Sequence, residues 1–216
     1  LFVIGEADGV TPLSTLFGEP LAEQVPVDLD DVVVLPYSSG TTGLSKGVML
    51  THRNLVANLA QTAGVVTLDD QESFVAVLPF FHIYGMSVIM NHGNSQGATL
   101  VTMPRFDLPL FLQLIQDHRV TRAFLVPPIV LALAKHPIVD DYDLSSLQVI
   151  FCGAAPLGAD LSQAAATRLD CIIKQGYGMT ETSPVTHLTP DLRVKDGKIG
   201  LLAANTEAMI VDIETL

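Results

Sequence analysis

The sequence is short of basic residues and of long apolar stretches. Its 216 residues include 11 Lys and Arg against 23 Asp and Glu, which gives a formal net charge of −12. Because no basic stripe offsets phosphate repulsion, nucleic-acid and anionic-membrane partners are disfavoured, and any phosphate site must be local. The longest apolar stretch, residues 123–134, is too short to span a bilayer and is broken by Pro127 and Pro128. No signal peptide is visible, so a cytoplasmic protein without a membrane partner is expected.

Cysteine is also scarce. Cys152 and Cys171 are the only two, they lie in apolar surroundings, and they lack the CxxC spacing. Buried, reduced thiols are therefore expected rather than a disulfide or a metal site, which suits the cytosol. With 49% hydrophobic residues, the chain can still form one sizeable core or a large part of a two-layer domain.

A loop rich in glycine and hydroxyl groups is the clearest motif: residues 37–47 read YSSGTTGLSKG. The preceding apolar residues 32–35 predict a buried strand that ends at Pro36. Glycines let backbone N–H groups turn toward one anion, hydroxyls add donors and Lys46 adds charge, which together predict a phosphate site. The motif is not a Walker A sequence, because Lys46 precedes Gly47. The alternative is a flexible surface linker, for which such composition is common.

Strand-like and helix-like segments alternate along the chain, after mostly irregular residues 6–30. The predicted strands are residues 2–4, 48–50, 74–78, 98–103, 122–126, 148–152 and 171–175, and the predicted helices are residues 51–63 with Thr51 as N-cap and Gly64 as its end, 86–96, 108–118, 128–135 and 159–169. This order predicts an α/β fold with a mainly parallel sheet, flanking helices and right-handed crossovers.

Open α/β sheets bind ligands at the carboxyl ends of their strands. Four loops are predicted at that edge and are expected to converge on one site: residues 38–47, 81–85, 153–158 and 176–182.

Two of these loops carry signals that are weak by themselves. Residues 79–85 read PFFHIYG, and a lone histidine beside aromatic residues, here His82, is more often a core residue than a catalytic one. Residues 153–157 read GAAPL, whose small side chains leave space for a flat ring, although an ordinary strand-to-helix turn uses the same residues.

The motifs together resemble a known superfamily. SSGTTGLSKG resembles the phosphate loop of adenylate-forming enzymes, which include acyl-CoA synthetases, firefly-type luciferases and peptide-synthetase adenylation domains, except that Ser45 replaces a common proline. QGYGMTET, residues 175–182, resembles the YGxTE signature of that superfamily, the alternative being a glycine-rich turn with a surface glutamate. FFHIYGM, TMPRFD, VPPIVLALAKHP, YDLSSL, GAAPLGADL and QGYGMTETSPV look most like the 4-coumarate:CoA ligase branch, over residues 32–212.

The resemblance implies a role for each motif residue. Lys46, His82, Thr180 and Glu181 would be the principal adenylation residues, with His82 orienting the substrate and Glu181 holding Mg²⁺. The residues implied in ATP binding are Ser38, Ser39, Gly40, Thr41, Thr42, Gly43, Lys46, Gly153, Ala154, Ala155, Gln175, Gly176, Tyr177, Gly178 and Thr180. Those implied in binding the carboxylic acid are His82, Tyr84, Ser87, Ala155, Gly176, Gly178, Pro184 and Val185.

The implied reaction joins a carboxylic acid to ATP and then to coenzyme A. Bringing a carboxylate to the α-phosphorus of ATP is opposed by charge repulsion, which Lys46, Mg²⁺ on Glu181 and loop N–H groups would neutralise. The acid expected is 4-coumarate or a related phenylpropenoate. A medium-chain or long-chain fatty acid or a luciferin-like acid could fit a similar pocket.

The resemblance also bears on domain organisation. The ribose-binding Asp of the family, its hinge and its small C-terminal domain with a catalytic Lys would all follow residue 216. We therefore expect residues 1–216 to be part of the N-terminal AMP-binding domain, inactive without the C-terminal lid domain. The rival hypothesis is a non-catalytic nucleotide-binding fragment.

Overall fold

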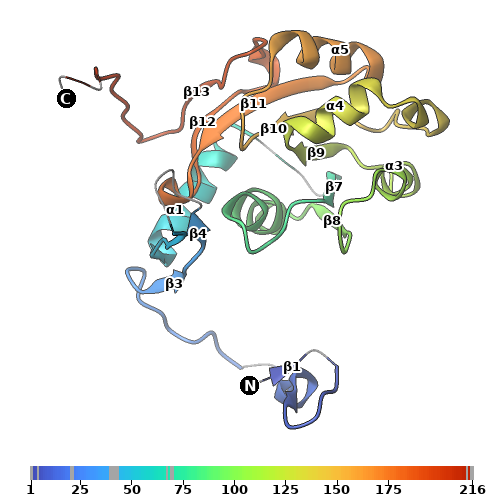
Figure 1. Cartoon of the computed structure of the whole chain (residues 1–216). Coiled ribbons are helices and arrows are strands. Elements are labelled where there is room, and N and C mark those ends of the chain that lie inside the picture. The colour runs from blue at the N-terminus through green and yellow to red at the C-terminus, as the bar shows by residue number, and fades with distance from the viewer. Residues whose placement is uncertain are drawn as a thin grey trace.

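The computed structural model describes residues 2–3, 5–19, 22–38, 44–66, 68, 71–212 and 214. A seven-stranded sheet forms its centre, with strands in the order β13-β12-β11-β10-β9-β7-β8 (Figure 1). These strands are β7 (Ser73–Ala76), β8 (Thr99–Thr102), β9 (Arg122–Leu125), β10 (Val149–Cys152), β11 (Ile172–Gly178), β12 (Val185–Leu188) and β13 (Leu201–Leu202).

The strands β8, β7, β9, β10 and β11 run parallel to one another, whereas β12 and β13 are antiparallel to their neighbours. All residues of β7, β9 and β10 are buried, because both faces of this part of the sheet are covered. The predicted α/β fold with a mainly parallel sheet is therefore confirmed.

Helices pack on both faces of the sheet. They are α1 (His52–Ala63), the π-helix η2 (Tyr84–Asn91), α2 (His92–Ser95), α3 (Leu108–Asp117), α4 (Pro127–Lys135) and α5 (Ala159–Leu169), with short 3-10 turns η1 (Leu13–Leu16), η3 (Pro137–Asp141), η4 (Thr180–Thr182) and η5 (Asp191–Arg193). The predicted bounds of α5 and the N-cap Thr51 of α1 are confirmed. The predicted helix 86–96 instead begins at Tyr84, as a π-helix.

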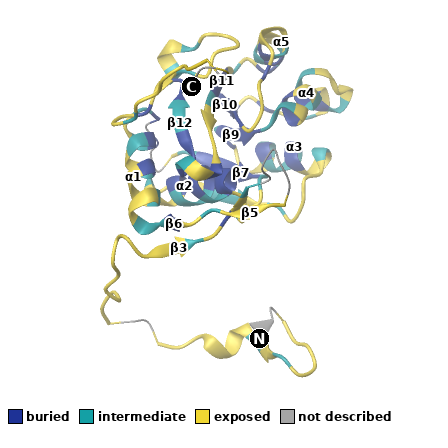
Figure 2. Ribbon diagram, turned by 60° about the vertical axis from the view of Figure 1, so that its left-hand side comes forward, coloured by how far each residue is buried: buried dark blue, intermediate teal, exposed yellow. Residues whose placement is uncertain are grey.

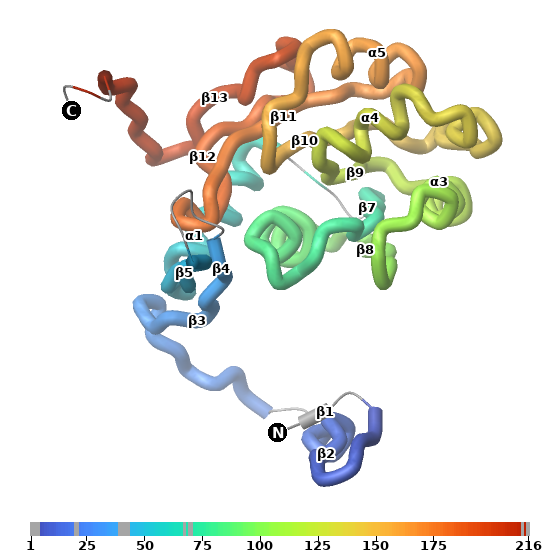
Figure 3. Tube along the Cα trace, viewed as in Figure 1, coloured from blue at the N-terminus to red at the C-terminus, as the bar shows by residue number. Residues whose placement is uncertain are grey.

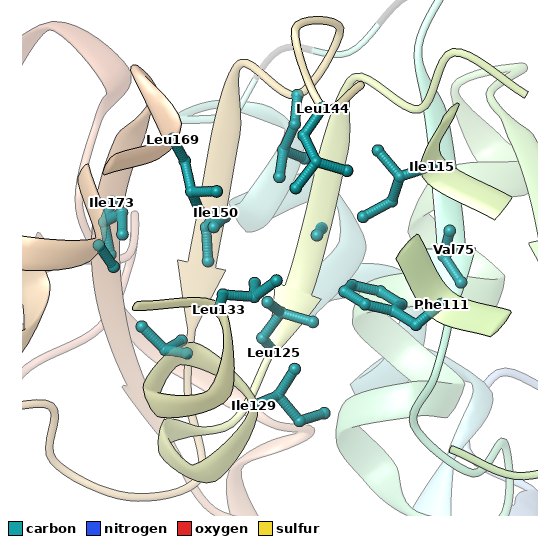
Figure 4. Packing of buried hydrophobic residues seen from close by; sticks show 14 of the residues in the cluster. Val75, Phe111, Ile115, Leu125, Ile129, Leu133, Leu144, Ile150, Leu169 and Ile173 are labelled. Atoms are coloured by element: carbon teal, nitrogen blue, oxygen red, sulfur yellow. The ribbon is translucent and has the colours of Figure 1, made fainter. Parts of the chain in front are cut away.

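One face of the sheet carries the larger apolar core. Phe111 and Ile115 of α3, Leu133 of α4 and Leu169 of α5 pack there against strand residues such as Ile150 (Figure 4). The opposite face packs against η2, through Tyr84, Val88, Ile89 and the ring cluster of Phe74, Phe124 and Phe151. No described helix combines the length and the apolarity needed to cross a membrane.

The N-terminal part lies outside this sheet. β1 (Phe2–Val3) and β2 (Thr11–Pro12) pair with each other and lie apart from the sheet (Figure 1). Residues 22–30, which lead toward the sheet, are exposed (Figure 2). β3 (Val32–Val34) pairs with β6 (Leu50–Thr51), and β4 (Tyr37–Ser38) pairs with β5 (Lys46–Gly47). The prediction of a buried strand at residues 32–35 was wrong about burial: Val33 is 40% exposed and Leu35 57% exposed, because β3 joins only a two-stranded sheet.

Buried charges connect the strands to η5. Arg122 of β9 pairs with Glu72 at 2.9 Å and with Asp191 at 3.3 Å, and the buried ammonium of Lys174 on β11 also pairs with Asp191. Burial by itself raises the pKa of Asp191, but the hydrogen bond and charge of Lys174 outweigh it, so the pKa lies below its ordinary value. Asp191 is therefore ionised and compensates two buried cations.

We expect Asp191→Ala to lower the free energy of unfolding by about 3–5 kcal/mol, because it leaves Arg122 and Lys174 without this carboxylate. The measurement is chemical denaturation at neutral pH. Arg53→Ala is the control: it breaks the exposed Arg53–Asp30 pair and should cost less than about 1 kcal/mol. Since the pKa of Asp191 is depressed when folded, its contribution holds above the unfolded pKa and is lost as the pH falls through the folded pKa. Equal losses in the two variants at neutral pH would contradict the assigned role.

Candidate active site

A cavity of about 180 Å³ opens at the carboxyl ends of β10 and β11. Its lining residues are His82, Ile83, Tyr84, Val88, Phe151, Gly153, Ala154, Gly176, Tyr177, Gly178, Met179, Thr180, Pro184, Val185 and His187. Three of the four loops predicted to converge, residues 81–85, 153–158 and 176–182, thus share one cavity, which confirms that part of the prediction.

The fourth loop reaches the same edge through its ends. β4 and β5 lie side by side (Figure 3), and Ser38 on β4 is opposite Lys46 on β5. β4 also contacts the η4 turn that carries Glu181. The predicted phosphate-loop residues Ser39, Gly40, Thr41, Thr42 and Gly43 lie outside the described residues.

Glu181 is the acidic group at this edge. The pKa of its exposed carboxyl lies below the ordinary value, first because its own backbone N–H donates to it, then because the Ser38 hydroxyl does so, and finally because Lys46 is near. The described residues include no group of three or more His, Cys, Asp or Glu side chains placed to hold a metal ion. A single ionised carboxylate still fits Mg²⁺ as it binds to nucleotides, with the remaining ligands supplied by phosphates and water.

His82 faces the cavity with a defined ring. Its Nδ1 accepts a hydrogen bond from the Tyr84 backbone N–H at 3.1 Å. In the neutral imidazole the proton must then be on Nε2, so His82 presents a donor and not a base. This arrangement suits a residue that orients an anionic oxygen, the role implied by the sequence.

Tyr84 lines the cavity with its ring only. Its hydroxyl donates to the Phe151 carbonyl at 3.0 Å and lies 3.4 Å from the Leu125 carbonyl. Burial, and then the nearby Cys152, raise the pKa of Tyr84 well above its ordinary value. Tyr84 therefore joins η2 to the strand ends and leaves its ring as a wall of the cavity.

Close backbone approach explains the glycines. A Cβ on Gly176 would lie 2.3 Å from the Phe151 ring, and one on Gly178 would lie 2.1 Å from the Pro184 carbonyl oxygen. A Cβ on Gly153 would lie 3.0 Å from the Tyr84 ring. The glycines thus let β11, β12 and η2 come together around the cavity.

The side chain of Gln175 holds the GAAPL turn by two hydrogen bonds. The Gln175 amide accepts from the Leu157 N–H at 2.8 Å and donates to the Leu157 carbonyl at 3.1 Å. Ala154 has a left-handed φ of +68° at the rim of the cavity, a conformation uncommon for residues with a side chain. Gln175, predicted to bind the nucleotide, is therefore engaged with the turn itself.

Two predicted acid-binding residues do not line the cavity. Ser87 is only 3% exposed and is not among the lining residues, and no described group hydrogen-bonds its hydroxyl. Ala155 is exposed next to the rim. On η2 the residues that line the cavity are Tyr84 and Val88, and in the turn after β10 Ala154 lines it in place of Ala155.

Several residues that line the cavity were not predicted from the sequence. Phe151 lies within the predicted strand 148–152, two residues before Gly153, which already marked the site. His187 lies cross-strand from Tyr177, with ring centroids 6.0 Å apart, and its alternation with Val185 would have shown it if β12 had been predicted.

Known proteins resemble this chain over most of its length. The family model described as AMP-binding enzyme matches residues 5–216. The chain belongs to the AMP-binding enzyme family. Among curated members, 4-coumarate–CoA ligase 2 of Petroselinum crispum is 45% identical over 202 residues, which cover 89% of this chain and 37% of that protein. The chain therefore spans a little over a third of the length of that relative.

Solved structures of AMP-binding enzymes share the fold. A long-chain-fatty-acid–CoA ligase from Archaeoglobus fulgidus superposes with a TM-score of 0.89 at 30% identity, covering 99% of this chain and 45% of that one. The ATP-bound MatB from Rhodopseudomonas palustris superposes with a TM-score of 0.80 at 28% identity, covering 88% of this chain and 38% of that one.

We expect Tyr84→Phe to lower the free energy of unfolding by about 1–3 kcal/mol, because the buried Phe151 carbonyl loses its hydroxyl partner. The measurement is chemical denaturation. Tyr37→Phe, at a side chain that is 70% exposed, is the control and should leave stability unchanged. If Tyr84→Phe left the free energy of unfolding unchanged, the hydroxyl would not be what holds η2 to the strand ends.

Proposed function

We propose that this chain forms the nucleotide-binding and acid-binding part of an ATP-dependent acid–CoA ligase. The observation that carries the proposal is the meeting of His82, Tyr177 and Thr180 in one cavity, with Glu181 and Lys46 beside it. Membership of the AMP-binding enzyme family supports it, as does the likeness to an ATP-bound enzyme.

The cavity residues would divide the work of adenylation. The Tyr177 ring would stack on adenine against Gly153 and Ala154, and Thr180 would donate to the α-phosphate. Lys46 and the predicted loop N–H groups would neutralise the triphosphate and the departing pyrophosphate. Mg²⁺, held by Glu181, would supply further positive charge at the phosphates.

His82 would orient the acid for attack. A carboxylate oxygen forms a bond to the α-phosphorus, and the bond from that phosphorus to the β-phosphate oxygen breaks in line, releasing pyrophosphate. The carboxylate needs no base, which agrees with a histidine that presents Nε2–H. The coenzyme A thiol would then attack the acyl carbon, losing its proton as AMP leaves.

The acid we propose is 4-coumarate or a related phenylpropenoate. The 45% identity to a plant 4-coumarate–CoA ligase supports this choice. The acid side of the cavity suits an aromatic ring. Val88, Phe151 and Val185 provide apolar walls for such a ring.

A C-terminal lid domain, which the family resemblance places after residue 216, would complete the enzyme. The free thiols of Cys152 and Cys171 support a location in the reducing cytoplasm. Burial raises the pKa of each of these thiols to about 12, which leaves them unreactive.

The test is carboxylate-dependent exchange of pyrophosphate into ATP, with this chain and with the longest form of the protein, across cinnamate-type and fatty acids. We expect the long form to exchange label with 4-coumarate and residues 1–216 alone not to do so. A preference for fatty acids would replace the proposed substrate. ATP binding without exchange for any acid would favour a non-catalytic nucleotide-binding protein.

In the long form, Lys46→Ala should lower the exchange rate on the order of 100-fold, because a cation at the phosphates is lost, while the melting temperature stays nearly unchanged. Lys198→Ala, at an exposed lysine that does not line the cavity, is the matched control and should retain full activity. Parallel losses of activity and thermal stability in Lys46→Ala would count against its role in catalysis.

A further inference from the structure

Helix α1 buries polar side chains where a surface helix ordinarily buries apolar ones. Its buried residues are Asn58, 5% exposed, and Thr62, 6% exposed. Thr62 donates to the carbonyl of Asn58 in the same helix at 2.8 Å. The Asn58 carbonyl is thus used within the helix, and its side-chain amide is the group that reaches another element.

That amide binds both backbone groups of Val185. Asn58 Oδ1 accepts from the Val185 N–H at 3.0 Å, and Asn58 Nδ2 donates to the Val185 carbonyl at 2.8 Å. The register of β11 and β12 shifts beside this point, between Tyr177 and Gly178. Asn58 thus provides Val185 with the donor and acceptor that a neighbouring strand would otherwise supply.

Val185 and Pro184 form one wall of the cavity. On the β11 side this wall already touches Gly178, where a Cβ would lie 2.1 Å from the Pro184 carbonyl oxygen. The wall is therefore fixed between Gly178 and the Asn58 amide, 127 residues away from Val185 in sequence.

We infer that Asn58 is a positioning residue that sets the acid-binding wall and so contributes to the choice of acid. The inference rests on the proposed function, because it takes the Pro184–Val185 side of the cavity as the acid side. Asn58 touches neither substrate and acts through Val185. The nucleotide side, at Tyr177 and Ala154, has no contact with α1 through this amide.

Replacing the Asn58 amide removes the hydrogen-bond partners of Val185. Asn58→Leu keeps a similar volume but leaves the buried N–H and carbonyl of Val185 unpaired, so the wall moves to find new partners. Asn58→Asp keeps an acceptor for the Val185 N–H and loses the donor to the Val185 carbonyl and to Gln61 Oε1. Thr62→Val removes a buried hydroxyl whose hydrogen-bond partner lies within α1 and keeps the Asn58 amide, which makes it the matched control.

The experiment measures pyrophosphate exchange by the longest form of the protein with these three variants. In Asn58→Leu we expect the KM for 4-coumarate to rise about tenfold, because part of the cost of leaving the two buried backbone groups of Val185 unpaired appears as a displaced wall. The KM for ATP should change by less than about twofold, and the preference between cinnamate-type and fatty acids should change. Asn58→Asp should be intermediate, and Thr62→Val should match the parent. If Asn58→Leu does not fold, the KM values of Asn58→Asp for the acid and for ATP provide the same test.

Two different failures are distinguishable. Absence of exchange by the unsubstituted long form would overturn the proposed function and this inference with it. Normal exchange by the parent, with the KM values for acid and ATP rising together in the Asn58 variants or with acid preference unchanged, would overturn the inference alone and leave Asn58 as a stabilising residue.

Discussion

The change of direction at β11 is the constraint on which the site depends. β11 pairs in parallel with β10 on one side and antiparallel with β12 on the other. The parallel neighbour brings the turn after β10 to the sheet edge, and the antiparallel neighbour folds Pro184 and Val185 back over the end of β11. The cavity lies between them, and β11 comes this close to Phe151 and Pro184 because Gly176 and Gly178 have no Cβ.

Much of the fold follows from local sequence signals. Thr51 caps α1, and the crossover helix α5 has the predicted bounds, because side-chain capping and apolar periodicity are local properties. Burial of β3 was not predictable, since it depends on which strand Val32 and Val34 pair with. The π-helix from Tyr84 also depends on long-range contacts, namely the carbonyls that its hydroxyl reaches.

The site was predictable where backbone chemistry forms it, at the glycine turns and at Thr180. It was less predictable where side-chain direction decides, as for Ser87, His187 and Asn58. Gln175 shows the difference well: its place beside Gly176 was apparent, whereas the engagement of its amide with Leu157 arises only when two chain segments meet. Lys46 and Glu181 show the same dependence on placement, because the charge of Lys46 acts on the Glu181 carboxyl only where β5 and η4 come together.

The tight contacts of the glycines limit how this pocket could diversify. At Gly176 and Gly178 a single methyl group would collide with a neighbouring ring or carbonyl, so these positions offer no gradual path to a smaller or larger pocket. Val88, Phe151 and His187 reach the cavity with side chains and can vary in size without moving the backbone. Differences in the size of this pocket among relatives of the chain should therefore accumulate at those three positions.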